Sequence, residues 1–237
     1  MDAEFLQRNM TLLQSEELFR LGTDAMVLAD FARIPRGAAV CDLCAGAGAV
    51  GMLLLAGDPG LTVTAVELQA EAVALMEQTA ARNGLAERLI PLQGDLRQIR
   101  RLLPMGSFRF VVCNPPYYPV GSGYAAERDA QAIARTEVCC TLEDVLLAAA
   151  WLLPTGGSLW MVHKPERLTD LLSGLRSRGL EPKVLRFVAN RVTAKPSLVL
   201  IKAVRGGRPG LDVQSPVYLQ TPDGSPTADY KRIYHMQ

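Results

Sequence analysis

Three carboxylates and a glycine-rich segment occur in the first hundred residues with a spacing that suits a nucleotide-type ligand. Asp42 follows an apolar stretch and precedes the pattern G-x-G-x-x-G formed by Gly46, Gly48 and Gly51. Glu67 ends the next apolar stretch, about twenty residues further on. Glycines in such a turn let a ligand approach the backbone at a helix N-terminus, and the carboxylate binds ribose hydroxyls.

Asp42 and Asp95 narrow the class of ligand. A carboxylate in the turn would repel the pyrophosphate of a dinucleotide, but it suits a cationic amino-acid group such as that of S-adenosylmethionine. Asp95 follows a third apolar stretch, where an acceptor for an adenine amino group is needed. Each acid alone is also explained as a helix cap or turn residue. Three acids at the carboxyl ends of successive strands favour a ligand site, because open α/β sheets bind ligands there.

A second cluster is Asn114-Pro115-Pro116-Tyr117, which follows the apolar stretch FRFVVC. Two adjacent prolines remove two backbone donors, and Asn-Pro often initiates a turn. A turn alone does not explain why an amide and an aromatic side chain accompany the prolines at the end of a buried strand.

Hydrophobic periodicity predicts the elements that position these residues. Helices are expected after Asp24, ending before Pro35, and at 48–56, 69–82, 142–153 and 166–179, with a shorter helical segment up to Leu103. Strands are expected at 38–44, 61–67, 88–95, 108–114, 157–163, 182–189 and 197–204. Alternating strands and helices predict an α/β fold with a seven-stranded, mostly parallel sheet and helices on both faces. The last two strands lack an intervening helix, so one strand is expected to be antiparallel.

The chain of 237 residues is 49% hydrophobic and 21% charged, which is typical of a globular protein. It contains neither an apolar run of ~18 residues nor the pattern of a signal peptide, so we expect a cytoplasmic protein without a membrane segment. We expect one domain over 1–237, with an N-terminal extension and helix (1–36), a core (37–205) and a surface tail (206–237). The sequence does not define an oligomeric state.

The five cysteines are an odd number and argue against a disulfide framework. Cys41 and Cys44 form a CxxC, but no second pair completes a metal site, so we expect buried thiols and no metal. Charge is uneven: residues 164–208 carry eleven Lys and Arg against three acids, whereas the rest carries 14 basic and 21 acidic residues. This asymmetry indicates a polyanionic partner, although solvated helix and loop faces explain it equally well.

D-x-C-A-G-A-G-x-x-G, Glu67, Asp95 and the motif NPPY resemble class I S-adenosylmethionine-dependent methyltransferases that methylate amino groups. The stretches FRLGTDAMVLADF, ARTE and VHKPERL, and the run SLVLIKAVRGGRPGL, are similar to bacterial tRNA adenine-37-N6 methyltransferases of the valine tRNA type. One departure is Thr136, where members of that branch have His. The resemblance covers nearly the whole chain and implies a Rossmann-like fold, S-adenosylmethionine as cofactor, and tRNA or another structured RNA as partner.

The resemblance also implies roles for individual residues. Asn114, Pro115, Pro116 and Tyr117 are expected to be catalytic: the Asn114 oxygen and the Pro115 carbonyl accept the amino hydrogens of an adenine, which stacks on Tyr117. The expected cofactor-binding residues are Gly22, Thr23, Asp24, Asp42, Cys44, Ala45, Gly46, Gly48, Glu67, Leu68, Gly94, Asp95, Leu96 and Asn114. The expected substrate-binding residues are Tyr117, Tyr118, Lys164, Arg167, Arg191 and Lys195.

A protein glutamine-N5 methyltransferase of the release-factor type is the alternative, because such enzymes use the same NPPY chemistry. They usually carry a separate N-terminal helical domain, for which the residues before the strand at Ala39 leave no room. A non-catalytic adenosyl-binding module is disfavoured by the intact NPPY. We therefore expect an RNA adenine-N6 methyltransferase.

Overall fold

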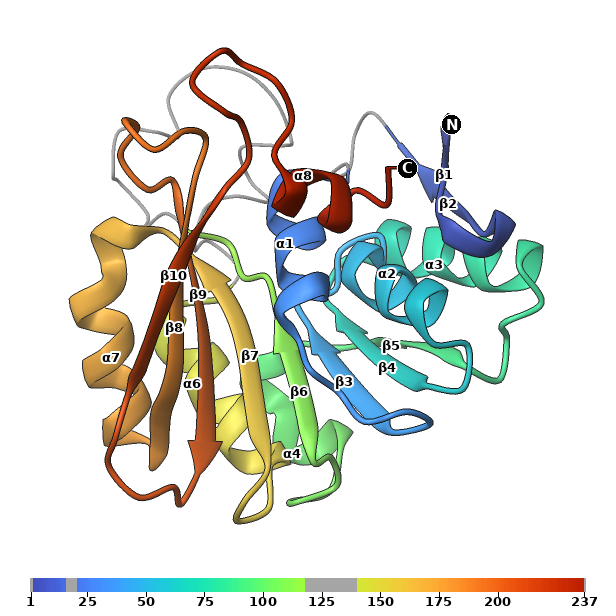
Figure 1. The fold of residues 1–237 in the computed structure, drawn as a ribbon. Coiled ribbons are helices and arrows are strands. Elements are labelled where there is room, and N and C mark those ends of the chain that lie inside the picture. The colour runs from blue at the N-terminus through green and yellow to red at the C-terminus, as the bar shows by residue number, and fades with distance from the viewer. Residues whose placement is uncertain (1, 16–20, 118–139, 237) are drawn as a thin grey trace, which may run out of the picture.

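The computed structural model describes residues 2–15, 21–117 and 140–236. Their centre is an eight-stranded sheet in the order β10-β8-β9-β7-β6-β3-β4-β5 (Figure 1). Within this sheet, as the described residues form it, β9 is antiparallel to both of its neighbours and all other adjacent strands are parallel. The predicted α/β fold with one antiparallel strand is thus confirmed, but the prediction of seven strands is wrong.

The first half of the sheet contains β3 (Ala39–Leu43), β4 (Thr62–Glu67) and β5 (Leu89–Gln93), which follow one another outward from the centre. The chain then returns to the other side of β3 with β6 (Phe110–Cys113) and β7 (Ser158–His163). The strand order therefore reverses between β3 and β6. In open α/β sheets this reversal creates the crevice that binds ligands, at the carboxyl ends of the strands.

Helices cover both faces of the sheet because the buried strands alternate their side chains between two cores. Val40, Val112 and Val162 belong to the core shared with α1 (Thr23–Phe31), α2 (Ala49–Gly57) and α3 (Ala70–Arg82). Cys41 and Val111 face the other core. That core is formed with the 3-10 helix Leu96–Gln98, α4 (Ile99–Leu102), α6 (Leu142–Leu152) and α7 (Leu168–Ser177).

The C-terminal segment is where the sequence prediction fails. After the pair β8 (Leu180–Ala189) and β9 (Leu198–Arg205), residues 212–218 form β10, which pairs in parallel with β8, and residues 228–233 form α8. The expected surface tail instead supplies the eighth strand and a helix. Most of β10 is exposed and it contains Pro216, a composition that suits an edge strand and hides its periodicity.

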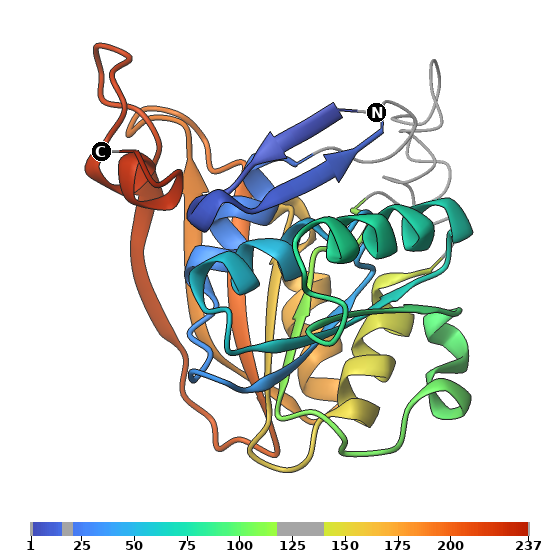
Figure 2. The same ribbon diagram turned by 90° about the vertical axis from the view of Figure 1, so that its right-hand side faces the viewer.

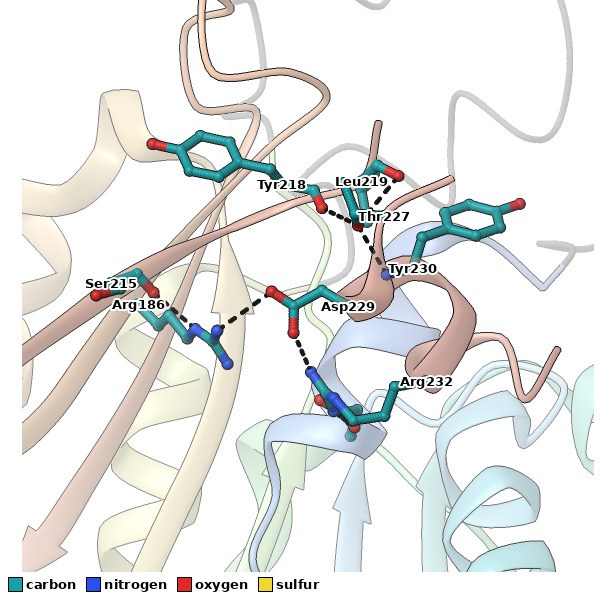
Figure 3. Close-up of polar contacts among 9 residues, drawn as sticks. Arg186, Ser215, Tyr218, Leu219, Thr227, Asp229, Tyr230 and Arg232 are labelled. Atoms are coloured by element: carbon teal, nitrogen blue, oxygen red, sulfur yellow. Dashed lines mark hydrogen bonds and ion pairs between the residues drawn. The ribbon is translucent and has the colours of Figure 1, made fainter. Parts of the chain in front are cut away.

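Ionic contacts hold α8 against the body of the protein. Figure 3 shows Arg186 of β8 bonding the Ser215 carbonyl at 2.8 Å and pairing with Asp229 of α8 at 3.6 Å. Asp229 also pairs with Arg232 at 2.7 Å, and Arg232 bonds Asp30 of α1. The last helix therefore connects β8 to α1, two elements far apart in sequence.

The N-terminal residues form a hairpin, β1 (Asp2–Phe5) and β2 (Thr11–Gln14), joined through the 3-10 helix Gln7–Asn9. Figure 2 shows the hairpin lying across the helical layer that contains α2 and α3. Asn83 at the end of α3 accepts from the Thr11 amide at 2.8 Å and donates to its carbonyl at 2.7 Å. Two polar contacts to one backbone residue thus fix where β2 meets α3.

Candidate active site

The turn between β3 and α2 has the conformation that the glycine pattern predicts. Gly46 and Gly48 have φ values of 55° and 82°, in the left-handed region that favours glycine. A Cβ on Gly48 would lie 2.9 Å from Met76, whereas one on Gly46 would meet no atom within 4 Å. Cys44 also has a positive φ, 57°. The open space beside Gly46 fits a ligand that approaches the backbone closely.

Asp42 is buried beneath this turn. One carboxylate oxygen accepts from the Gly51 amide in the first turn of α2 at 3.1 Å, and the other has no partner within the described residues. Burial, opposed by the Gly51 bond and reinforced by the nearby Glu67 charge, raises the pKa of Asp42 to about 7. Asp42 thus anchors the N-terminus of α2, and its second oxygen is buried without a hydrogen-bond partner among the described residues.

Glu67 ties the end of β4 to the glycine turn. Its two oxygens accept from the amides of Gly46 at 2.9 Å and Gln69 at 3.0 Å. A carboxylate oxygen has more than one lone pair, so ribose hydroxyls can bind without displacing either amide. Leu68, the next residue, is exposed at the same strand end.

Asp95 caps the 3-10 helix that follows β5, accepting from the Arg97 amide at 2.9 Å. The Arg97 guanidinium forms a forked pair with the same carboxylate and holds its pKa below the ordinary range. The adjacent Gly94 donates to the Glu67 carbonyl at 2.8 Å, and Leu96 is buried. An adenine amino group at Asp95 would have to share the carboxylate with Arg97.

The NPPY motif leaves β6 beside the glycine turn, because β6 is the neighbour of β3. Pro115 is buried, and so is Tyr117, with 6% of its surface exposed. The Tyr117 hydroxyl bonds Asp24 at 2.7 Å and also contacts the Asn114 side-chain oxygen. The predicted cofactor residue Asp24 therefore contacts the predicted catalytic motif.

His163 and Lys164, at the end of β7, pack against the Tyr117 ring. The His163 ring meets it edge to face at 5.4 Å between centroids, and the Lys164 ammonium lies 4.9 Å from its centre. Burial lowers the pKa of His163 to about 4, so this imidazole is neutral at pH 7. An adenine stacking on Tyr117 must either displace Lys164 or use the other ring face. Sequence reasoning did not select His163; its only signal was its place at a strand end.

The remaining N-terminal cofactor candidates, Gly22 and Thr23, line a cavity away from the glycine turn. They line a cavity of about 340 Å³ together with hairpin residues and Tyr234, and the Thr23 and Tyr234 hydroxyls bond at 2.8 Å. The lining contains neither the glycine turn nor Asn114. A cofactor contact for these two residues stays a prediction.

The described cysteines are free thiols. Cys44 lies 3.8 Å from Cys140 between the sulfur atoms, and its contact with Cys113, together with burial, raises its pKa. Protonated thiols are poor nucleophiles and metal ligands, and no group of three metal-ligating side chains occurs in the described residues. Cys44 and Ala45 therefore contribute backbone to the turn.

The basic side chains of residues 164–208 do not all lie at the carboxyl ends of the strands. Lys164, Arg167, Arg191 and Lys195 follow the carboxyl ends of β7 and β8, on the edge that carries NPPY. Arg176 and Arg178, at the other end of α7, pair with Glu181 and Glu143. Only part of the local charge excess can thus face a ligand beside NPPY. Tyr118 and Thr136 lie outside the described residues.

A doubly wound sheet, a glycine turn at its reversal point and NPPY on the next strand define the class: a Rossmann-like methyltransferase. The methyltransferase small domain family matches residues 15–172, and the chain belongs to that family. Membership of this methyltransferase family supports S-adenosylmethionine as the cofactor. In the described residues, no helix has the length and apolarity to cross a membrane.

Curated relatives include a tRNA1(Val) (adenine(37)-N6)-methyltransferase of Shewanella sp., 28% identical and covering 73% of this chain and 74% of the relative. A release factor glutamine methyltransferase of Deinococcus radiodurans is 30% identical over 61% and 52% of the two chains. Among solved structures, a predicted O-methyltransferase from Agrobacterium tumefaciens has a TM-score of 0.71, 24% identity and coverage of 90% and 96%. This structural likeness shows the fold of the chain.

Proposed function

We propose that this chain transfers a methyl group from S-adenosylmethionine to the exocyclic N6 amine of an adenine in RNA, in a tRNA near the anticodon and in the cytoplasm. The observation that carries the proposal is the delivery of Asn114 and Tyr117 by β6 next to the β3 glycine turn. The curated tRNA adenine-N6 relatives, which span most of the chain, support the choice of acceptor.

An adenine amine is a poor nucleophile because its lone pair is delocalised into the ring. The Asn114 side-chain oxygen and the Pro115 carbonyl each accept one amino hydrogen, which leaves the lone pair directed at the methyl group. The two prolines fix the direction of that carbonyl. When bound, the cofactor supplies an electrophilic methyl group on its sulfonium. The chain therefore works by positioning, which can contribute about 7–11 kcal/mol to lowering a barrier.

Asp42, Glu67 and the glycine turn would hold the cofactor. The turn lets the ligand approach the backbone beside Gly46, where a Cβ would meet nothing. Glu67 would take the ribose hydroxyls and Asp42 the amino-acid ammonium. Asp95 would accept from the adenine amino group in competition with Arg97.

Mass spectrometry of nucleosides tests the proposal. Total tRNA from a strain lacking this gene should lose N6-methyladenosine, and the purified protein with S-adenosylmethionine should restore it. An unchanged tRNA, together with loss of methylation on a release-factor glutamine, would establish the second candidate, which the Deinococcus relative favours.

A further inference from the structure

The Tyr117 hydroxyl stands between two oxygens that compete for its single proton. It bonds the Asp24 carboxylate at 2.7 Å, across 93 residues of sequence, and it contacts the Asn114 side-chain oxygen. Tyr117 is buried and its ring is held by His163 and Lys164. The hydroxyl is therefore fixed in place and cannot turn away from either neighbour.

A tyrosine hydroxyl donates one hydrogen and accepts others. It can serve Asp24 or the Asn114 oxygen, but not both. A carboxylate is the stronger acceptor, since hydrogen bonds to charged groups are roughly twice as strong as neutral ones. With the proton directed at Asp24, the Tyr117 oxygen presents lone pairs to Asn114. The stable arrangement then has the Asn114 amide turned by half a rotation, with its NH2 donating to Tyr117.

That rotation moves the Asn114 oxygen away from Tyr117 to the other side of the amide. We infer that Asp24 is a positioning residue, which acts through Tyr117 to free the Asn114 oxygen for the acceptor amine. An amine must donate its hydrogens, so an amide that presented NH2 would repel it. The inference rests on the proposed function for the identity of the acceptor, and it gives Asp24 a role different from cofactor binding.

The contacts of α1 fit this role. Asp24 lies in its first turn, and the neighbouring Thr23 hydroxyl bonds Tyr234 of the C-terminal segment at 2.8 Å. This contact holds the first turn of α1, which carries the Asp24 carboxylate, against the C-terminal segment.

The test is a double-mutant cycle with Asp24→Asn and Tyr117→Phe. Each keeps the shape of the side chain while removing the charge or the hydroxyl. The kcat for methylating tRNA from the deletion strain should fall about tenfold in each, the difference between a charged and a neutral hydrogen bond. The double variant should be no slower than the slower single variant, because both break the same chain of bonds. Affinity for S-adenosylhomocysteine, by calorimetry, should stay within about threefold.

Asp30→Asn is the matched control, since it is the same change on the same helix, at a partly exposed ion pair with Arg232 that touches neither Tyr117 nor Asn114; it should leave kcat unchanged. Additive effects in the cycle would overturn the inference. So would a loss of S-adenosylhomocysteine affinity in Asp24→Asn alone, which would make Asp24 a cofactor ligand.

A spectroscopic measurement separates this inference from the proposed function. In the 15N-labelled protein without substrate, the Asn114 side-chain NH2 resonances, assigned by their loss in Asn114→Ala, should shift in both Tyr117→Phe and Asp24→Asn. Unmoved resonances would overturn the positioning role whatever the acceptor is. Shifted resonances in an enzyme that leaves tRNA unmethylated would refute only the proposed acceptor, and the kinetic cycle would then use the release-factor glutamine.

Discussion

The two halves of the candidate site are held together by different kinds of contact. On the cofactor side, Asp42 accepts from a backbone amide in the first turn of α2, and Glu67 accepts from amides in the glycine turn and just after β4. On the acceptor side, Asn114, Tyr117 and Asp24 hold one another through side-chain bonds, with Lys164 over the ring. The cofactor half is therefore built into the backbone, whereas single substitutions can rearrange the acceptor half.

The largest effect is expected from substituting Asn114, in the acceptor half of the site. Asn114→Ala should lower the rate of methyl transfer about 10²–10³-fold, the cost of losing one preorganised hydrogen bond at a reacting group. Cofactor affinity should stay within a few-fold, because the glycine turn does not depend on this side chain. Single-turnover kinetics and calorimetry with S-adenosylhomocysteine check the two halves separately. An active Asn114→Ala enzyme would mean that NPPY serves only as a turn.

Substituting Glu67, in the cofactor half, is expected to weaken cofactor binding. Glu67→Ala removes charge-assisted bonds of about 1.5–3 kcal/mol each, so affinity for S-adenosylhomocysteine should fall at least tenfold. The two amides at Gly46 and Gln69 also lose their acceptor. Glu71→Ala, an exposed residue on α3, is the control and should bind normally. Equal affinity of both variants for S-adenosylhomocysteine would show that Glu67 does not bind the cofactor.

The same contrast explains which features the sequence could predict. The glycine turn and Glu67 follow from local spacing, because the bonds of Glu67 and Asp42 to that turn and to α2 span only 21 and 9 residues of the chain. The bond between Asp24 and Tyr117 spans 93 residues and pairs two motifs that the sequence assigned to different roles. No periodicity encodes such a pair. Likewise β10 was missed because an edge strand carries little apolar alternation.

A pH dependence should sharpen the role of Asp42. Its folded-state pKa of about 7 lies above its ordinary 3.8, so below pH 7 the carboxyl is mostly protonated. An ammonium group binds the ionised form, so binding releases a proton. Affinity for S-adenosylhomocysteine should therefore rise roughly tenfold from pH 6 to pH 8.

Two comparisons check the cause of that rise. 5′-Methylthioadenosine lacks the ammonium group, and its affinity should change little over the same range. Asp42→Asn should flatten the profile for S-adenosylhomocysteine. A rise of the same size for both ligands would point to a titrating group other than Asp42.

By the same linkage, the free energy of unfolding should fall as pH rises from about 4 through 7, since the Asp42 carboxyl binds its proton more tightly in the folded state than in the unfolded chain.

The smallest effect is expected where the acceptor half meets the nucleic acid. Arg191 and Lys195 are exposed in the connection between β8 and β9, on the edge that carries NPPY, and Arg191 bonds Gln220 at 3.2 Å. If both contact phosphates, replacing them with Ala should weaken tRNA binding and make the log–log slope with salt about 1.4 less steep, at about 0.7 per contact for single strands.

The control for charge alone is Arg176→Ala, which removes an exposed arginine paired with Glu181 at the other end of α7. Each of these substitutions removes one positive charge. If tRNA binding depended on net charge alone, Arg176→Ala would therefore weaken it as much as replacing Arg191 or Lys195. A response limited to Arg191 and Lys195 would locate the RNA at the carboxyl edge. The target adenine then has to leave its stack to reach Tyr117, which costs least in an unpaired loop. A slope that is unchanged in all variants would mean that RNA does not contact this edge through phosphates.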